Sequence, residues 1–309
     1  MKVLITDNNL GDSVMESEIL HKALGAEVKI AQCSTEEELL GEVKAFNPDA
    51  LIVQWAPVTA RVIRAATNCT FISRMGIGID MIDVDSAEAA NITIRNVPHY
   101  CTEEVASHAI ALILSLNRRV VEFNSEIRSG LWNAPDHAKS IKKLSSSTVG
   151  LLGLGRIGKV VGQTMQALGA ELVAVDPIEG PDKIARVSME ELADRADFIS
   201  VHAPLLPETH HVLGAEFFDR CKRQPIIVNT SRGQIIDTVA LAAGLGSGQL
   251  GGAGLDVFES EPVDTSHPLF SSPRTILTPH AAWCSADALP ELRRQTAQNV
   301  VDHFVSSAR

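Results

Sequence analysis

The chain has 309 residues, of which 45% are hydrophobic and 21% charged, and its net charge is −11. This length is sufficient for two domains, and the ordinary composition excludes a wholly disordered chain. The acidic balance excludes a typical nucleic-acid binder, because such proteins neutralise phosphates with clustered Lys and Arg.

The N-terminus and the cysteines indicate the compartment in which the protein works. Residues 1–7 are typical of a strand rather than a leader, and no apolar stretch reaches the roughly 18 residues that a membrane span needs. The five cysteines are widely spaced and form no C-x-x-C pair, which disfavours a disulfide framework and a zinc site. We therefore expect a cytoplasmic protein with no metal and with no membrane or nucleic-acid partner.

Short apolar runs alternate with helical patterns along the whole chain. Strands are predicted in the first third at residues 3–6, 28–31, 51–54, 71–74 and 92–95. A second set is predicted at residues 148–152, 172–175, 198–201, 226–229, 252–255 and 275–277. Runs that are apolar without alternation are typical of parallel strands covered on both faces. The pattern predicts an α/β protein with two doubly wound parallel sheets.

Helical patterns lie between these strands and at the end of the chain. The pattern over residues 13–24 ends at Gly25, and the pattern over residues 35–46 ends before Pro48, as capping and proline sterics require. A longer pattern over residues 102–129 begins with an N-cap and acidic residues in its first turn. The final stretch, 285–305, is also helical in composition.

A glycine-rich turn follows the strand predicted at residues 148–152 and opens a helical pattern. The turn reads Gly153-Leu154-Gly155-Arg156-Ile157-Gly158. In a dinucleotide fingerprint the first glycine allows the tight turn, the second lets a pyrophosphate approach the backbone, and the third lets helix and strand pack closely. Asp176 ends the next strand, about 20 positions further on, where a carboxylate accepts hydrogen bonds from ribose hydroxyls. Because this carboxylate would also repel a 2′-phosphate, we predict NAD rather than NADP as the cofactor.

Three other interpretations of the glycine turn are open at this point. Gly153 to Lys159 also spells G-x-x-x-x-G-K, as in a P-loop, but Val160 stands where that loop needs a Ser or Thr for magnesium. A methyltransferase can use a similar glycine turn and acid. The turn could also serve packing alone.

Three side chains at strand ends in the second half could carry hydride-transfer chemistry on a 2-oxo acid. Arg232 follows the strand at 226–229, and its planar fork suits a carboxylate in two-point contact. His280 follows the strand at 275–277, and imidazole is the usual proton shuttle near neutral pH. Glu261 could fix the tautomer of the His280 ring. The sequence alone does not bring Glu261 and His280 together, and each could instead be a structural or solvated loop residue.

Taken together, the motifs resemble those of the D-isomer-specific 2-hydroxyacid dehydrogenases, in order and spacing over nearly the whole chain. The matching runs are residues 74–80, 96–98, 150–158, 176–177, 202–205, 208–209, 229–233, 254–258, 261–262 and 278–280. The resemblance implies a Rossmann NAD-binding domain at residues 99–280, inserted into a smaller flavodoxin-like substrate domain formed by residues 1–98 and 281–309. It also implies that the cleft between the domains holds the reaction.

The resemblance further implies the roles of individual residues. Arg232, Glu261 and His280 would form the catalytic set, with His280 as the acid/base and Glu261 as its partner. Backbone amides around Ile77 and Gly78 would help to hold the substrate carboxylate. The residues that would contact the cofactor are Val105, Gly153, Gly155, Arg156, Ile157, Gly158, Asp176, Pro204, Thr209, Thr230 and Asp256.

The run His280-Ala281-Ala282-Trp283 is similar to the branch of the family that includes the C-terminal-binding proteins. Trp283 would then point toward the substrate pocket and select a larger or sulfur-containing side chain, unless it only anchors the last helix. We expect an NAD-dependent D-2-hydroxyacid dehydrogenase, or 2-oxo acid reductase, that acts as a homodimer on a small-molecule acid. The alternative is an NAD(H)-sensing interaction protein with little turnover. A phosphoglycerate dehydrogenase is disfavoured because the chain stops at Arg309, which leaves no room for a regulatory domain.

Overall fold

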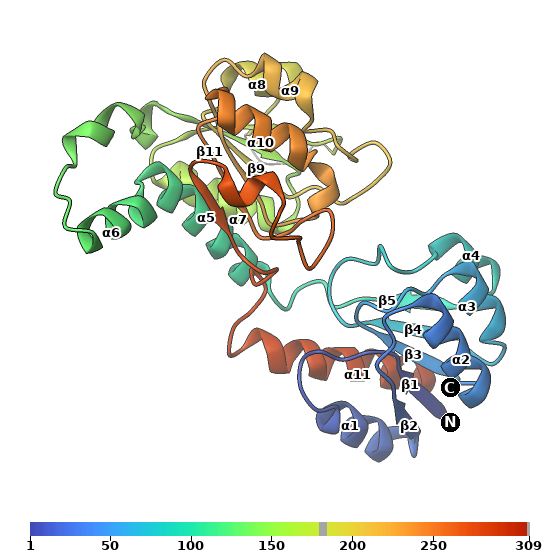
Figure 1. Ribbon diagram of the computed structural model, residues 1–309. Helices are drawn as coiled ribbons and strands as arrows, with labels where there is room; N and C mark the ends of the chain where they lie inside the picture. Colours follow the sequence, from blue (N-terminus) through green and yellow to red (C-terminus); the bar gives the residue numbers. More distant parts are fainter. Residues whose placement is uncertain (179–183, 308–309) are drawn as a thin grey trace. The chain divides into compact units, whose positions relative to one another are not determined.

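The computed structural model describes residues 1–178 and 184–307, except for the side chain of Ser307. The chain forms two compact units, one of Met1–Cys101 with Cys284–Arg309 and one of Thr102–Trp283. Each unit has its own parallel sheet (Figure 1). Each also has its own hydrophobic core. The domain boundaries predicted after residues 98 and 280 lie close to the ends of these units, at 101 and 283.

The first unit is built on a five-stranded parallel sheet of order β2-β1-β3-β4-β5. Its strands are β1 (Lys2–Ile5), β2 (Glu27–Ile30), β3 (Ala50–Val53), β4 (Phe71–Arg74) and β5 (Thr93–Arg95). Its helices are α1 (Val14–Leu24), α2 (Glu36–Phe46), α3 (Ala60–Ala65), α4 (Val84–Ala89) and α11 (Ala288–Ser307). Every residue of β3 and β4 is buried, which explains why these runs are apolar without alternation. The strand order is that of flavodoxin-like sheets.

Local sequence signals explain the limits of α2. The Thr35 side chain accepts from the amide of Glu38, whose carboxylate in turn accepts from the amide of Thr35 over 3.0 Å, so the helix begins with a capping box. At its other end Asn47 adopts a left-handed φ of 47° and donates its amide to the Val43 carbonyl. The helix therefore ends before Pro48, as predicted.

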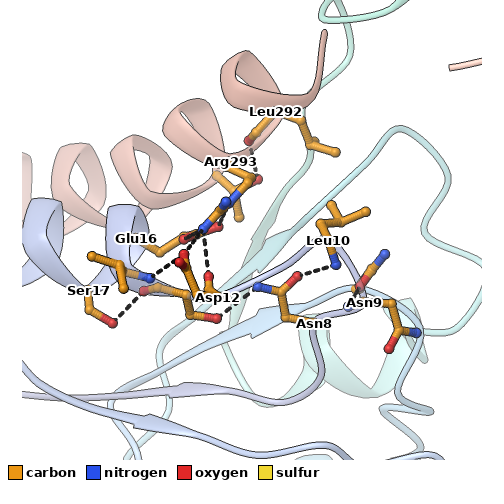
Figure 2. A network of polar contacts seen from close by, with 12 residues as sticks. Asn8, Asn9, Leu10, Asp12, Glu16, Ser17, Leu292 and Arg293 are labelled. Carbon is orange, nitrogen blue, oxygen red and sulfur yellow. Dashed lines mark hydrogen bonds and ion pairs between the residues drawn. The ribbon is translucent and has the colours of Figure 1, made fainter. Parts of the chain in front are cut away.

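An ion pair at a buried position joins α11 to α1, although these helices lie at opposite ends of the sequence (Figure 2). Arg293 donates from Nε to Glu16 Oε1 over 2.7 Å and from Nη2 to Glu16 Oε2 over 2.8 Å. The Glu16 side chain is completely buried, and the same Nη2 also donates to the Asp12 carbonyl over 2.7 Å. The contact is therefore bidentate, and it fixes the last helix to the first unit.

The second unit is built on a seven-stranded parallel sheet of order β12-β11-β10-β9-β6-β7-β8. Its strands are β6 (Thr148–Leu152), β7 (Glu171–Val175), β8 (Ala185–Arg186), β9 (Phe198–Val201), β10 (Ile226–Asn229), β11 (Gly252–Leu255) and β12 (Thr275–Leu277). Its α-helices are α5 (Thr102–Asn117), α6 (Val120–Arg128), α7 (Arg156–Ala167), α8 (Met189–Arg195), α9 (Ala215–Arg220) and α10 (Thr238–Ser247). Short 3₁₀ helices lie at Pro135–Ser140, Leu144–Ser146, Gly233–Ile235 and Pro268–Ser271.

Helices cover both faces of this second sheet (Figure 1). One apolar cluster packs α5 and α7 against it, and another packs α8, α9 and α10. The predicted fold class, an α/β protein with two doubly wound parallel sheets, is confirmed. Within residues 1–178 and 184–307, every helix falls short of the length and apolar content needed to cross a bilayer.

One predicted helix is wrong, because the pattern over residues 102–129 forms two helices. The break is at Arg119, whose φ is +54°, a left-handed conformation that cannot continue a helix. Tertiary contacts hold the break: Asn117 exchanges hydrogen bonds of 3.0 and 2.9 Å with the backbone of Lys142, and Arg119 Nη1 donates to Ser140 Oγ over 2.8 Å. These partners lie more than 20 residues away, so the local pattern did not show them.

Candidate active site

The glycine turn between β6 and α7 has the shape that a dinucleotide requires. Gly153 has a φ of +93°, and a Cβ there would lie 2.6 Å from the amide nitrogen of Ala203. A Cβ on Gly158 would lie 2.4 Å from the Gly153 carbonyl oxygen. At Gly155, by contrast, no described atom beyond its chain neighbours lies within 4 Å of a Cβ, so the turn is open there. This geometry fits the roles predicted for the three glycines, namely the tight turn, room for a pyrophosphate and close packing of helix on strand.

We expect Gly153→Ala to weaken NADH binding by about tenfold or more. The new methyl group would collide with backbone atoms of Ala203, and the alanine would have to adopt a φ that is strained for any residue with a side chain. Such strain costs about 1–3 kcal/mol. A cost of about 1.4 kcal/mol in binding lowers the affinity tenfold. Fluorescence titration with NADH measures the change. Gly41→Ala on α2 is the matched control, since no described atom would lie within 4 Å of its Cβ. A folded Gly153→Ala protein with unchanged NADH affinity would contradict the assignment.

Asp176 lies beside the glycine turn, as the fingerprint predicts. Its Oδ2 accepts from the amide of Leu154 over 2.6 Å, and its Oδ1 accepts from the amide of Ile178 over 2.8 Å. These bonds fix the carboxylate at the end of β7, next to the open position at Gly155. Arg156 is exposed and Ile157 half-buried in the first turn of α7, at the positive end of that helix.

The other residues predicted to contact the cofactor lie in the second unit as well. Thr209 Oγ1 donates to the Pro204 carbonyl over 2.7 Å, which closes the loop after β9. Thr230 follows β10, and its buried Oγ1 has no hydrogen-bond partner among the described residues. A buried hydroxyl without a partner is costly, so a bound group that satisfies it fits this position. Val105 is buried near the start of α5. Most of these residues follow the carboxyl ends of neighbouring strands, the edge at which such sheets bind ligands.

His280 and Glu261 are hydrogen-bonded, as the family resemblance implied, although their spacing in the sequence did not place them together. His280 Nδ1 lies 2.7 Å from Glu261 Oε2, and Glu261 Oε1 accepts from the amide of Phe258 over 2.9 Å. An ionised carboxylate can only accept, so Nδ1 of His280 carries a proton. The other ring nitrogen, Nε2, is then the atom that gains and loses a proton when the ring changes charge.

The environment of Glu261 keeps its carboxylate ionised. Burial acts to raise its pKa, but the hydrogen bond and charge of His280, the amide of Phe258 and the Arg232 guanidinium together lower the pKa below its usual range. Glu261 therefore carries a negative charge at neutral pH, where it stabilises a positive charge on His280. The positive charge of Arg232 is one of the causes that lower the pKa of Glu261.

Close backbone packing explains why Arg232 lies near Glu261. A Cβ on Gly233 would lie 1.9 Å from the carbonyl carbon of Phe258, so only glycine allows the loop after β10 to pack directly on the loop that leads to Glu261. The Asn229 side chain donates to the Arg232 carbonyl over 2.8 Å, and Arg232 Nη1 donates to the Ser231 carbonyl over 2.8 Å. The loop is thus fixed by its own polar contacts.

The remaining predicted substrate residues lie in different places. Ile77 and Gly78 belong to the first unit, where the Asn96 side chain donates to the Ile77 carbonyl over 2.6 Å and fixes this loop. Trp283 is half-buried at the end of the second unit. Asn96 was not among the predicted site residues. The run that contains it matched the family, but no local signal pointed to a bond with a residue 19 positions away.

Comparisons with known proteins agree with this geometry. Residues 110–282 match the profile described as "D-isomer specific 2-hydroxyacid dehydrogenase, NAD binding domain". The chain is 36% identical over 252 residues to a glyoxylate reductase of Korarchaeum cryptofilum, covering 79% of this chain and 76% of that protein. It is 35% identical over 297 residues to a D-3-phosphoglycerate dehydrogenase of Mycobacterium leprae, covering 94% of this chain and 55% of that protein. The chain therefore spans about half the length of this second relative.

A solved structure is similar over nearly the whole chain. It is that of a D-lactate dehydrogenase from Aquifex aeolicus, complexed with NAD and lactic acid, with a TM-score of 0.87, 26% identity and coverage of 99% of this chain and 96% of that one. The chain thus belongs to the family of D-isomer-specific 2-hydroxyacid dehydrogenases, and residues 110–282 are its NAD-binding domain. The predicted family and the predicted cofactor, NAD, are confirmed. The placement in the C-terminal-binding-protein branch stays a prediction.

Proposed function

We propose that the protein is an NAD-dependent D-2-hydroxyacid dehydrogenase that reduces a small 2-oxo acid, or oxidises the corresponding 2-hydroxy acid. The observation that carries the proposal is the bond of 2.7 Å between His280 and Glu261, on whose loop Gly233, the neighbour of Arg232, packs directly. The pair lies in the unit that also holds the glycine turn. The relatives named glyoxylate reductase and D-lactate dehydrogenase support the same activity.

The residues of this site suit each need of the reaction. The bound nicotinamide cofactor would supply or accept the hydride. The Arg232 guanidinium binds the substrate carboxylate through two parallel hydrogen bonds and polarises the adjacent carbonyl. Protonated His280 donates its Nε2 proton to the carbonyl oxygen in the reductive direction and takes it back in the oxidative direction. Glu261 holds the ring by Nδ1 and stabilises its positive charge. The substrate-binding roles of Ile77, Gly78 and Trp283 stay predictions.

A coenzyme-oxidation screen tests this activity. We expect the protein to oxidise NADH in the presence of at least one of four 2-oxo acids: glyoxylate, hydroxypyruvate, its phosphate ester and a methylthio-substituted acid. NADPH should be a poorer substrate than NADH, because the Asp176 carboxylate repels a 2′-phosphate. Absence of turnover with all four acids, together with nucleotide-dependent binding of a protein partner, would favour the NAD(H)-sensing alternative and contradict the proposal.

We also infer that the protein is a homodimer, with the region around α6 as the contact between copies. None of the described α6 residues is buried, and Val120 and Val121 are each about half exposed. Trp132, just beyond the helix, is 90% exposed. Exposed apolar side chains favour a protein contact where they lie together, and a second copy is the occupant expected from the family resemblance. Sedimentation velocity of wild type and Trp132→Asp tests this, with a dimer and a weakened dimer as the expected results. The cytoplasmic location stays a prediction.

A further inference from the structure

The turn that carries His280 is held by a second carboxylate, that of Asp256, which is buried and is separate from Glu261. Asp256, at the end of β11, is 1% exposed. Its Oδ1 accepts from the amide of Ala281 over 2.9 Å and its Oδ2 accepts from the amide of Ala282 over 2.8 Å. Its carbonyl accepts from the amide of His280 itself over 2.8 Å. One residue thus holds three successive amides of the turn.

This turn needs such support because its backbone is in a strained conformation. His280 has a φ of +52°, in the left-handed region that residues other than glycine rarely adopt. Such a conformation persists only where the surroundings hold it in place. The position of the His280 ring therefore depends on the contacts of Asp256, in addition to the bond with Glu261.

A chain of two further side chains reaches this carboxylate from α5. The Thr278 hydroxyl donates to Asp256 Oδ1 over 2.6 Å, and His108 Nε2 lies 3.0 Å from the same hydroxyl. A hydroxyl has one proton, and the carboxylate can only accept, so the Thr278 proton points to Asp256. His108 must then donate its Nε2 proton to Thr278. The number of available protons therefore fixes the direction of both hydrogen bonds, from His108 to Thr278 and from Thr278 to Asp256.

His108 also supplies a cation, when protonated, close to the buried charge. Its Nε2 lies 3.7 Å from Asp256 Oδ1, and the ring is about one-quarter exposed. Among the described residues, the other bonds to the carboxylate come from neutral groups, namely the Thr278 hydroxyl and two amides. A buried carboxylate is costly without hydrogen bonds, so loss of the Thr278 or His108 contact weakens its hold on the turn.

We propose that His108 is a positioning residue, which holds the His280 turn in the geometry for proton transfer through the Thr278 hydroxyl and the Asp256 carboxylate. The inference rests on the proposed function for its effect on turnover, but not for its effect on the His280 ring. It gives Asp256 a role within the protein beside its predicted contact with the cofactor. Neither His108 nor Thr278 was among the predicted site residues, because they are 170 positions apart.

Two pairs of variants test the proposal by kinetics. Thr278→Val removes the hydroxyl at nearly constant shape and Thr278→Ser keeps it, whereas His108→Leu removes the donor and His108→Gln keeps an N–H at the same distance from the backbone. We expect Thr278→Val and His108→Leu to lower kcat by up to about 10²-fold, the effect of a misplacement of about 1 Å. KM for the 2-oxo acid and Kd for NADH should change much less. The Ser and Gln variants should keep most of the wild-type kcat, as should His21→Leu, an exposed histidine on α1.

Other kinetic results overturn the inference. Unchanged kcat in both Thr278→Val and His108→Leu would show that the network does not position His280. Equal losses in all four variants would indicate a packing defect. A rise in Kd for NADH at unchanged kcat would assign the network to cofactor binding.

A second measurement reads the His280 ring without turnover, so a failure of the proposed function stays distinguishable. In protein labelled with ¹⁵N-histidine, the ring signals of His280, assigned by their loss in His280→Gln, report its hydrogen bonds. We expect Thr278→Val to shift these signals and Thr278→Ser to leave them close to their wild-type positions. Signals that are identical in wild type and Thr278→Val would overturn the inference whether or not any 2-oxo acid is reduced.

Discussion

Replacement of His280 by Ala is expected to lower kcat for 2-oxo acid reduction by about 10²- to 10⁴-fold, the usual contribution of a positioned general acid. The physical reason is the loss of the Nε2 proton donor. The bond of 2.7 Å between Nδ1 and Glu261 orients the ring that carries this donor. The affinity for NADH should change little, because the glycine turn and Asp176 do not depend on this ring. Steady-state kinetics with the best acid from the screen and a fluorescence titration with NADH measure both quantities.

A comparison of two further variants makes this expectation specific. Glu261→Gln keeps an oxygen that can accept from Nδ1 but removes the charge that stabilises the protonated ring, so it should also lower kcat with unchanged NADH affinity. His21→Ala, at an exposed position on α1, should behave as wild type. Full turnover in His280→Ala would show that the proton comes from another group, and the assigned role of His280 would be wrong.

Removal of Glu16 is expected to destabilise the first unit by about 3–5 kcal/mol, the range found when one partner of a buried ion pair is removed. Glu16→Ala leaves the Arg293 guanidinium, which is only 12% exposed, without the bidentate carboxylate shown in Figure 2. Urea denaturation, followed by fluorescence and circular dichroism, measures the change. Because the chain has two units, we expect two unfolding transitions. Glu16→Ala should lower the stability seen in the transition of the first unit and leave that of the second unit unchanged.

Two controls separate the charge effect from a general weakness of α1. Glu18→Ala removes an exposed carboxylate from the same helix and should change the free energy of unfolding by no more than about 0.5 kcal/mol. The double variant Glu16→Met with Arg293→Met replaces both partners by apolar side chains, and it should lose less stability than Glu16→Ala alone. If Glu16→Ala and Glu18→Ala were equally stable, the buried pair would have no part in holding α11.

The strands could be predicted from the sequence because their signal is local. The limits of β6, β10, β11 and β12 agree with the predicted ranges, since each is a short apolar run between turn residues. The two-residue strand β8 was missed, because Ala185 and Arg186 form no such run. The break between α5 and α6 was also missed, because it depends on Asn117 and on its contacts with a distant loop.

The candidate site follows the same division between local and distant signals. Gly153, Asp176 and Arg232 could be found because each lies within three residues of the end of an apolar strand, at the edge where parallel sheets bind ligands. The contact between His280 and Glu261 could not be predicted from spacing, because it depends on how two loops fold over the sheet edge. The bond between His108 and Thr278 joins helix α5 to the end of β12. These residues are 170 positions apart in the sequence, so only the structure reveals the bond.

The placement of α11 has a consequence for the order of events during synthesis. Leu292 and Val300 of this helix belong to the same apolar cluster as Val3 and Phe71, and the Ser73 hydroxyl donates to the Thr296 carbonyl over 2.8 Å. The first unit therefore cannot complete its core until the last helix has left the ribosome. The second unit is one continuous stretch of chain, and all of its strands are synthesised before α11. We expect nascent chains to bury the core of the NAD-binding unit first, while the core of the first unit waits for α11.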